Sequence, residues 1–246
     1  MVDLHTHVLP GVDDGARTMA EALSQLRDAR DKGVGALACT PHLRMGETAD
    51  LSALLDDRRR IHERLVRAAD AEGGLPDVGL GAEVLLVDDG TPFDDPGMRI
   101  NGGPYALTEL LFGLRDFAAV RAIFGRILDG GCRPLLAHVE RYPHLLGFDL
   151  IDQLRQDGVL TQVNASSLVG QHGDAIRRRA EELLDSDRAD VVASDAHGPH
   201  MRLNYMAEAR LLVERRSGPA FARRLFEDVP RTIFDGRPLP AEVVGG

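Results

Sequence analysis

Tryptophan is absent from this chain, and aromatic residues make up only 4% of it. A core must therefore consist mainly of Leu, Val, Ile and Ala, and the hydrophobic share of 43% is enough for a sizeable one. No apolar run is long enough to span a bilayer, and no signal peptide is expected before the first histidine, His5. We therefore expect a cytoplasmic protein without membrane insertion.

Cysteine is scarce. Cys39 and Cys132 lie in apolar runs and form neither a disulfide framework nor a C-x-x-C pair, so we expect buried thiols in a reducing compartment. Thiol-dependent tyrosine phosphatases need an arginine at the sixth position after the nucleophilic cysteine. This chain has Met45 and His138 at those positions, which excludes phosphocysteine chemistry.

Positive charge is also in deficit, because the formal net charge is −10. Long-range electrostatics would repel nucleic acid and anionic membranes. A nuclease or phosphodiesterase is therefore a weak alternative, although a local cationic pocket stays possible.

The remaining pattern is a rhythm of short apolar strands and longer helical segments. Strands are expected at 2–8, 35–42, 77–87, 104–112, 133–140, 160–168 and 190–197, and helices at 24–33, 50–74, 117–131, 204–216 and 220–229, with further helical segments between the last strands. This alternation predicts an α/β fold with parallel strands. About seven strands without a clean linker favour a helix-covered barrel over an open sheet. We expect one domain over residues 1–246, with the Gly-, Pro- and Asp-rich loop 90–103 as a rim or lid.

The chain begins with two histidines in an expected strand. His5 and His7 are two residues apart, so their imidazoles point to the same face and could reach one ion. Alone, H-x-H is a weak signal, and surface or hydrogen-bonded histidines are its more common explanation.

Later strand ends strengthen the case for a metal site. Six apolar runs end in histidine or a carboxylate, and their end residues are His5, His7, His42, Glu83, Glu109, His138, Asp195 and His197. Each alone is typical of a solvated strand end, but a barrel gathers these ends on one face, where active sites lie. Imidazole and carboxylate ligands without cysteine favour Mn, Fe or Zn. Clustered ions lower the pKa of bound water to roughly 7, which suits hydrolysis of phosphate monoesters.

Together these motifs resemble a known superfamily. The series D-x-H-x-H, L-P-G-x-D-D-G, T-P-H, an isolated Glu, H-x-E-R-Y, N-A-S-S-L-x-G and S-D-A-H is similar to that of the polymerase-and-histidinol-phosphatase (PHP) superfamily. From residue 2 to about residue 210 the chain resembles its bacterial manganese-dependent protein-tyrosine phosphatases of capsule and exopolysaccharide loci. Asp14 favours this branch, because many other relatives have histidine there. The resemblance implies a distorted (β/α)7 barrel.

The resemblance also implies three divalent ions, with manganese favoured over iron or zinc. The implied ligands are His5, His7 and Asp195 for one ion, Asp14, His42 and His197 for a second, and Glu109 and His138 for a third, with Glu83 bridging the first and third. Two departures are visible. Val139 replaces the branch's usual proline without removing a ligand, and the stretch LRMGETAD after His42 is less basic than expected, which leaves substrate choice open.

Two arginines follow the ligand motifs. Arg141 and Arg202 are expected on loops beside the ions, where a guanidinium can bind phosphate oxygens in bidentate fashion and assist the leaving group. A surface ion pair is the alternative for any single arginine in an Arg-rich chain. Asp13 receives no ligand role and could simply shape the turn. The other histidines are expected to be structural or exposed: His62, His144, His172 and His200.

The leading hypothesis is a metal-dependent phosphatase for phosphotyrosine in proteins. From the family context, its partner would be a bacterial tyrosine autokinase of polysaccharide export. The alternatives are a phosphatase for a small metabolite such as histidinol phosphate, and a catalytically idle metal-binding module that regulates a partner. The sequence leaves the oligomeric state open.

Overall fold

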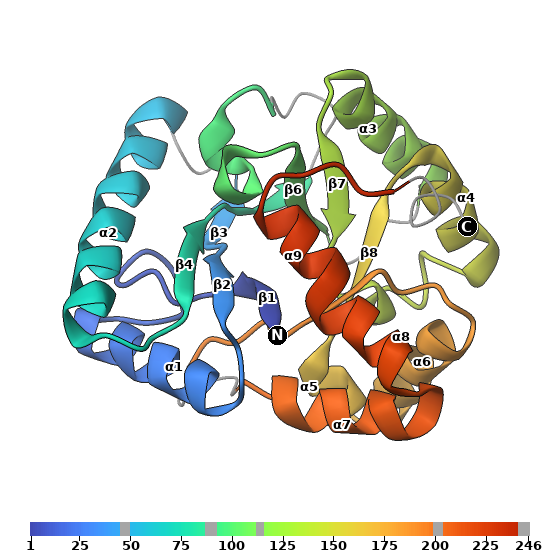
Figure 1. Cartoon of the computed structure of the whole chain (residues 1–246). Coiled ribbons are helices and arrows are strands. Elements are labelled where there is room, and N and C mark those ends of the chain that lie inside the picture. Colours follow the sequence, from blue (N-terminus) through green and yellow to red (C-terminus); the bar gives the residue numbers. More distant parts are fainter. Residues whose placement is uncertain (45–49, 87–92, 112–115, 199–203, 241–246) are drawn as a thin grey trace.

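The computed structural model describes residues 1–44, 50–86, 93–111, 116–198 and 204–240 (Figure 1). The strands are β1 (Val2–Thr6), β2 (Ala36–Cys39), β3 (His42–Arg44), β4 (Asp77–Leu80), β5 (Glu83–Leu86), β6 (Tyr105–Leu110), β7 (Arg133–Leu136), β8 (Leu160–Asn164) and β9 (Val191–Ala193). The helices are α1 (Met19–Asp31), α2 (Leu51–Glu72), α3 (Phe117–Asp129), α4 (Phe148–Asp157), α5 (Ala165–Leu168), α6 (Asp174–Asp185), α7 (Met206–Ser217), α8 (Pro219–Arg223) and α9 (Val229–Phe234). Single turns are η2 (Pro96–Met98), η3 (Ile100–Gly102), η4 (Val139–Arg141) and the π-helical η5 (Arg224–Asp228).

All paired strands are parallel, in the orders β1-β2-β4 and β3-β5-β6-β7-β8-β9. The polypeptide connects the two sheets directly, because β2 in the first sheet leads into β3 in the second, and β4 leads into β5 in the same way. Backbone bonds from Gly81 N to Cys39 O (2.8 Å) and from Glu83 N to Pro41 O (3.1 Å) cross this break. Pro41 lacks an N–H and so interrupts the regular ladder.

The two outer strands of this arrangement meet. A parallel bridge joins Thr6 and Ala196, and backbone bonds of 2.9 Å run from Asp195 N to His5 O and from His7 N to Ala196 O. The strands therefore form a distorted ring, which the helices surround (Figure 1). The predicted barrel-type α/β fold is confirmed.

Two apolar clusters stabilise the fold. The outer cluster lies between strands and helices. The inner cluster fills the barrel and includes Leu4, Leu107, Leu135 and the α9 residues Val229 and Ile233. Burial of side chains of this size contributes about 1.5–3 kcal/mol each. Helix α9 thus closes the amino ends of the strands and leaves the carboxyl ends for polar side chains.

Several sequence expectations need correction. Helix α1 begins at Met19, earlier than residue 24, because Thr18 accepts a hydrogen bond from Glu21 N as its N-cap. The expected strand 160–168 ends at Asn164, since Ala165–Leu168 is helical. The expected strand 133–140 ends at Leu136, and Val139–Arg141 is a helical turn.

The expected lid over 90–103 is wrong for its described part, 93–103. The Asn101 side chain accepts a hydrogen bond from Leu80 N and donates one to Phe234 O, while Ile100 joins the inner cluster near α9. This segment therefore packs at the amino end of the barrel, away from the strand ends that carry the histidines. Residues 90–92 lie outside the described part.

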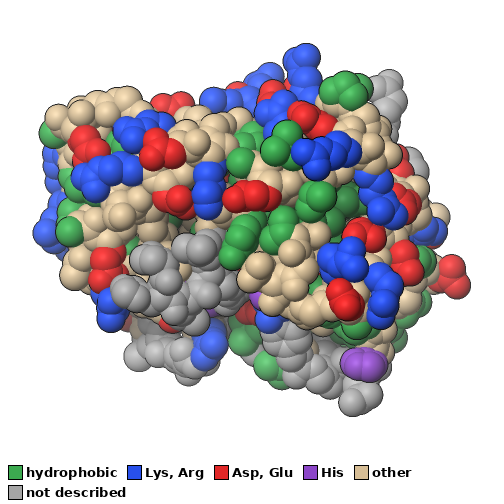
Figure 2. Space-filling model, turned by 90° about the horizontal axis from the view of Figure 1, so that it is seen from below, with side chains coloured by type: hydrophobic (Ala, Val, Ile, Leu, Met, Phe, Trp, Pro, Cys, Tyr) green, Lys and Arg blue, Asp and Glu red, His purple; other side chains and the backbone are tan. Residues whose placement is uncertain are grey.

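Surface charges of the two signs are interspersed on the face shown in Figure 2. Among the described residues, arginines pair with acidic neighbours, as in the Arg216–Asp185 and Arg224–Asp187 pairs. That face presents no continuous basic surface among its described residues, consistent with the negative net charge. Among the described helices, none combines the length and apolarity needed to cross a bilayer.

Candidate metal centre

The predicted ligands converge at the carboxyl ends of the strands, as the barrel hypothesis expected. Their donor atoms fall into three groups, each within 4.8 Å: His7 with Asp14, His42 and His197; His5 with His7 and Glu83; and His42 with Glu83 and Glu109. His138 and Asp195 lie against these groups. All nine residues therefore lie in or beside one connected cluster.

A β-bulge helps to aim the first two histidines. Val2 and Asp3 pair with Ala36 and Leu37, but the next pair joins Thr6 to Cys39, so β1 has one extra residue. Such a bulge re-aims side chains. Within the bulged stretch Leu4 joins the inner core, whereas His5 faces the cluster together with His7; both histidines are buried, and their Nε2 atoms are 3.3 Å apart.

The D-D-G turn holds His7 through Asp13, a function that the sequence did not indicate. His7 Nδ1 lies 2.7 Å from Asp13 Oδ2, which also accepts from His42 N at 3.1 Å, while Asp13 Oδ1 accepts from Gly15 N at 3.0 Å. Gly15 is required by close approach, because a Cβ there would lie 1.9 Å from His7 O. The turn therefore fixes the ring of His7 and leaves Nε2 facing the cluster.

The His7–Asp13 pair has strongly shifted acidities. Burial alone would lower the pKa of His7, but Asp13 and Asp195 outweigh it and raise that pKa to about 10. Burial alone would raise the pKa of Asp13, but His7 holds it well below its usual range. Without a metal ion, His7 is therefore protonated at neutral pH.

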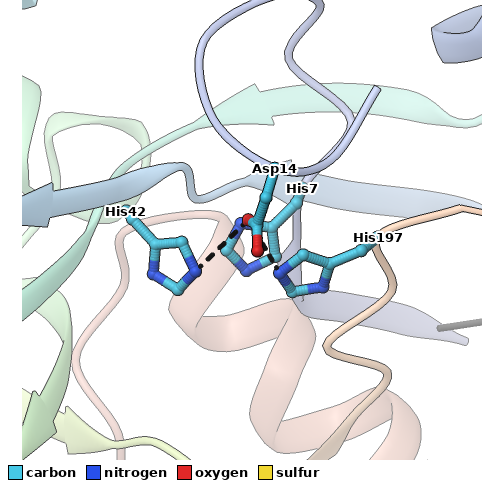
Figure 3. Close-up of side chains that lie close together, drawn as sticks. All are labelled: His7, Asp14, His42 and His197. Carbon is cyan, nitrogen blue, oxygen red and sulfur yellow. Dashed lines mark ion pairs between the residues drawn. The ribbon is translucent and has the colours of Figure 1, made fainter. Parts of the chain in front are cut away.

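Asp14 lies opposite two histidines that come from distant parts of the chain (Figure 3). Its Oδ1 is 3.2 Å from His197 Nε2 and 3.5 Å from His42 Nε2, and the rings of His7 and His197 stack at 3.7 Å between centroids. Asp14 is 46% exposed, so this group lies at the solvent side of the centre. The geometry adds His7 to the set predicted for this ion.

Asp195 lies between the first two histidines. Its Oδ1 is 3.5 Å from His5 Nε2 and 3.6 Å from His7 Nε2. Burial would raise the pKa of Asp195, but His5 and His7 hold it well below its usual range. Asp195 therefore stays ionised and offers an acceptor oxygen to the two imidazoles.

Glu83 occupies the middle of the cluster. Its Oε2 lies 2.8 Å from His42 Nδ1, 3.4 Å from His5 Nε2 and 3.5 Å from His7 Nε2, and its Oε1 lies 3.1 Å from His138 Nε2. Burial would raise the pKa of Glu83, but these histidines hold it well below its usual value.

The surroundings of Glu83 fit a divalent cation. Within the described part of the chain, its buried Oε2 accepts no well-aligned hydrogen bond, although it faces imidazole nitrogens. A buried carboxylate oxygen surrounded in this way costs free energy unless a cation neutralises it. The nitrogen and oxygen donors, without thiolate, match the preferences of Mn, Fe and Zn.

Glu109 completes the third group. Its Oε1 lies 3.7 Å from His138 Nε2. Burial and the neighbouring Glu83 carboxylate raise the pKa of Glu109 to about 7. The carboxyl end of β6 thus places a second carboxylate beside the Glu83–His138 pair.

Two of the proposed ligands have unusual backbones. His138 has φ 37° and Asp195 has φ 53°, both in the left-handed region that residues other than glycine rarely adopt. Strain of this kind costs about 1–3 kcal/mol and persists where the surrounding structure holds it. Both residues follow strand ends, so the strain turns their side chains into the cluster.

One of the two predicted phosphate-binding arginines is described. Arg141, at the end of η4, lies 3.8 Å from Asp195 Oδ2, and its side chain is 26% exposed. Its guanidinium therefore lies between the buried cluster and solvent. Arg202 lies outside the described residues.

The remaining histidines are accounted for. His62 is hydrogen-bonded to Val78 O at 3.0 Å, His172 lies 3.1 Å from Ser166 Oγ, and His144 is exposed. They take no part in the three groups of metal-ligating side chains. His200 lies outside the described residues.

Comparison with known proteins shows the family of this chain. The model of the family described as capsular polysaccharide synthesis, CpsB/CapC, matches residues 1–235. The chain belongs to the CpsB/CapC family. This confirms the resemblance seen in the motifs.

Similarity to individual CpsB/CapC proteins extends over nearly the whole chain. It is 28% identical over 247 residues to the tyrosine-protein phosphatase CpsB of Streptococcus pneumoniae, covering 95% of this chain and 98% of the relative. It is 27% identical over 253 residues to the tyrosine-protein phosphatase YwqE of Bacillus subtilis, covering 98% and 97%.

A solved structure confirms the CpsB/CapC fold. A structure described among those of YwqE from Bacillus subtilis and CpsB from Streptococcus pneumoniae, "unique metal-dependent tyrosine phosphatases", matches with a TM-score of 0.86 at 24% identity. The match covers 98% of this chain and 96% of the other.

Proposed function

We propose that this chain is a metal-dependent phosphatase that removes phosphate from phosphotyrosine in proteins. The observation that carries the proposal is the cluster of imidazoles and carboxylates at the carboxyl ends of the strands, with the orphaned oxygen of Glu83 at its middle. Membership of the CpsB/CapC family supports the substrate class, because the relatives compared above are named tyrosine phosphatases.

The cluster would hold three divalent ions, with manganese favoured over iron or zinc. The ligand sets would be His5, His7 and Asp195; Asp14, His42 and His197, with His7 close to this set as well; and Glu109 and His138, with Glu83 shared between the first and third sets. When bound, such ions supply a water of lowered pKa and neutralise charge on phosphate. The chemistry of the donors supports this assignment.

Residues of this chain prepare the centre for that chemistry. Asp13 holds His7 by Nδ1, so Nε2 faces the cluster. In the metal-free centre the pKa of His7 is raised to about 10 and that of Glu109 to about 7, so ion binding releases the proton of His7 and the fraction still bound to Glu109. The negative cluster otherwise repels a phosphate dianion, and cations remove this barrier.

Arg141 binds the phosphate oxygens of the substrate. Its guanidinium lies at the solvent side of Asp195, where the planar fork of donors can contact two phosphate oxygens. Arg202, which lies outside the described residues, is proposed to act on the same substrate. Together they orient the phosphate and stabilise the leaving tyrosyl oxygen.

The physiological substrate would be a phosphotyrosine protein in the cytoplasm, namely a tyrosine autokinase of polysaccharide export. The family description, capsular polysaccharide synthesis, supports this context. Because the Asp14 side chain is 46% exposed, a phosphotyrosine would reach the centre from this side.

The experiment compares three substrates after reconstitution. Protein stripped with EDTA is reloaded with Mn²⁺, and turnover is measured on a phosphotyrosine peptide, on histidinol phosphate and on a phosphodiester. A clear preference for the peptide is expected. A preference for histidinol phosphate would favour the metabolite phosphatase, and bound Mn²⁺ without any turnover would favour the regulatory module.

A further inference from the structure

Two buried amides on β8 connect three of the proposed metal ligands. Gln162 and Asn164 are fully buried and lie two residues apart, so they share one face of the strand. A buried amide costs free energy unless it is hydrogen-bonded. They are the third and the last residue of β8, a strand of five residues that are all buried.

The two amides form one chain of hydrogen bonds. Gln162 Oε1 lies 3.1 Å from His5 Nδ1 and accepts from the His138 backbone N–H at 3.1 Å. Gln162 Nε2 donates to Asn164 Oδ1 at 2.7 Å, and Asn164 Nδ2 donates to Asp195 Oδ2 at 2.8 Å. Segments from β1, β7, β8 and β9 are thereby joined.

The backbone N–H of His138 determines which atom donates and which accepts in each of these hydrogen bonds. A backbone N–H can only donate, so Gln162 must turn its oxygen toward His138 and its NH₂ toward Asn164. Asn164 must then accept with its oxygen and turn its NH₂ toward Asp195. His5 must carry its proton on Nδ1, which leaves the Nε2 lone pair facing the cluster.

The same series of hydrogen bonds orients the Asp195 carboxylate. Its Oδ2 is held by Asn164, while its Oδ1 faces His5 Nε2 and His7 Nε2 at 3.5 and 3.6 Å. Asn164 is itself anchored, because its backbone N–H donates to Glu140 Oε1 at 3.1 Å.

We infer that Gln162 and Asn164 are positioning residues, which set the imidazole tautomer of His5 and the carboxylate orientation of Asp195 for binding of a divalent cation. The inference rests on the proposed metal site. Partners of this kind typically change metal affinity by 10–100-fold. Neither amide touches substrate, so their effect passes through the ligands.

The test measures Mn²⁺ binding to metal-stripped protein by the electron paramagnetic resonance signal of free Mn²⁺. Gln162→Met keeps side-chain length but removes both hydrogen-bonding groups, and we expect affinity to fall by about 10–100-fold. Gln162→Glu keeps an oxygen facing His5 and His138 and is expected to recover part of the loss. Gln156→Met, on the exposed face of α4, is the matched control and should bind as the unmodified protein does.

Thermal unfolding in EDTA shows whether a substitution at Gln162 or Asn164 destabilises the metal-free fold, apart from its effect on Mn²⁺ affinity. Unchanged Mn²⁺ affinity of Gln162→Met, with or without a lower melting temperature, would overturn the inference. If that variant does not fold, the isosteric Asn164→Asp decides, because its carboxylate cannot donate to Asp195: weaker binding supports the inference and unchanged binding overturns it. Failure of the unmodified protein to bind Mn²⁺ would instead contradict the proposed function.

Discussion

Single side chains carry the chemistry of this centre, and their contributions differ in kind. Asp195 and His138 face the cluster from strained backbone positions, whereas Arg141 lies at its solvent side. Asp13 acts through its contacts with the ring of His7 and the backbone of His42. Substitutions at these positions should therefore separate loss of metal from loss of substrate binding.

Loss of a ligand should remove both metal and activity. Asp195→Ala and His138→Ala each remove a proposed metal ligand, so the centre around Glu83 would bind fewer ions. We therefore expect no measurable turnover. Elemental analysis of the purified variants, beside a phosphopeptide assay, checks this. A variant with full ion content and normal turnover would contradict the assignment.

Loss of Arg141 should leave the metal in place. Arg141→Ala removes a guanidinium that donates hydrogen bonds to the substrate phosphate. We expect kcat/KM to fall by about 100-fold or more with unchanged ion content. Arg60→Ala, whose side chain is 72% exposed on α2, is the matched control and should retain full activity. Loss of bound metal in Arg141→Ala would refute its role in phosphate binding.

The His7–Asp13 pair predicts the pH dependence of the metal-free protein. The pKa of His7 is raised in the folded state to about 10, above its unfolded value of about 6.5. Its contribution to stability is therefore complete below about pH 6.5 and is lost as the pH rises toward about 10. Urea unfolding in EDTA should show this decline, and Asp13→Asn should flatten it.

At the scale of elements, turns and strand ends place these side chains. The bulge in β1, the D-D-G turn and the left-handed residues after β7 and β9 each redirect the chain where a strand ends. Such irregular positions require room for the backbone as well as suitable side chains. At Gly15 only glycine leaves enough room for the backbone of His7.

Gly15→Ala tests that dependence. Its Cβ would lie 1.9 Å from His7 O, so the turn must shift, and we expect about 1–3 kcal/mol lower stability and weaker Mn²⁺ binding. Gly125→Ala is the matched control, because its Cβ meets open space in α3 and alanine should stabilise that helix by about 0.5–1 kcal/mol. Equal stability changes in the two variants would argue against the close approach.

At the scale of the whole molecule, the metal centre ties the barrel together. Its donors come from the first and last strands and from most strands between them, so ions bound there stabilise only the folded chain. At 100 times the dissociation constant, one ion adds about 2.7 kcal/mol to the free energy of unfolding. We expect Mn²⁺ to raise the melting temperature with concentration and EDTA to reverse the rise, as calorimetry can measure.

The residues themselves predicted much of this protein. Apolar runs followed by longer amphipathic segments predicted the parallel α/β barrel, because period and length reflect burial directly. His, Asp and Glu at successive strand ends predicted the cluster, since parallel strands bring their carboxyl ends to one face.

Only the tertiary structure decided how these side chains act on one another. Asp13 looked like a turn residue, because nothing in the D-D-G motif itself shows that its carboxylate holds the ring of His7. Gln162 was not singled out, and Asn164 entered only as part of the N-A-S-S-L-x-G motif, because their partners His138, Asp195 and His5 lie 24 to 157 residues away and leave no local pattern. The described part of the 90–103 loop likewise packs at the opposite end of the barrel through contacts with Phe234. Sequence specified which groups meet at the centre, and long-range packing specified their orientation, since orientation depends on neighbours that the chain brings together only on folding.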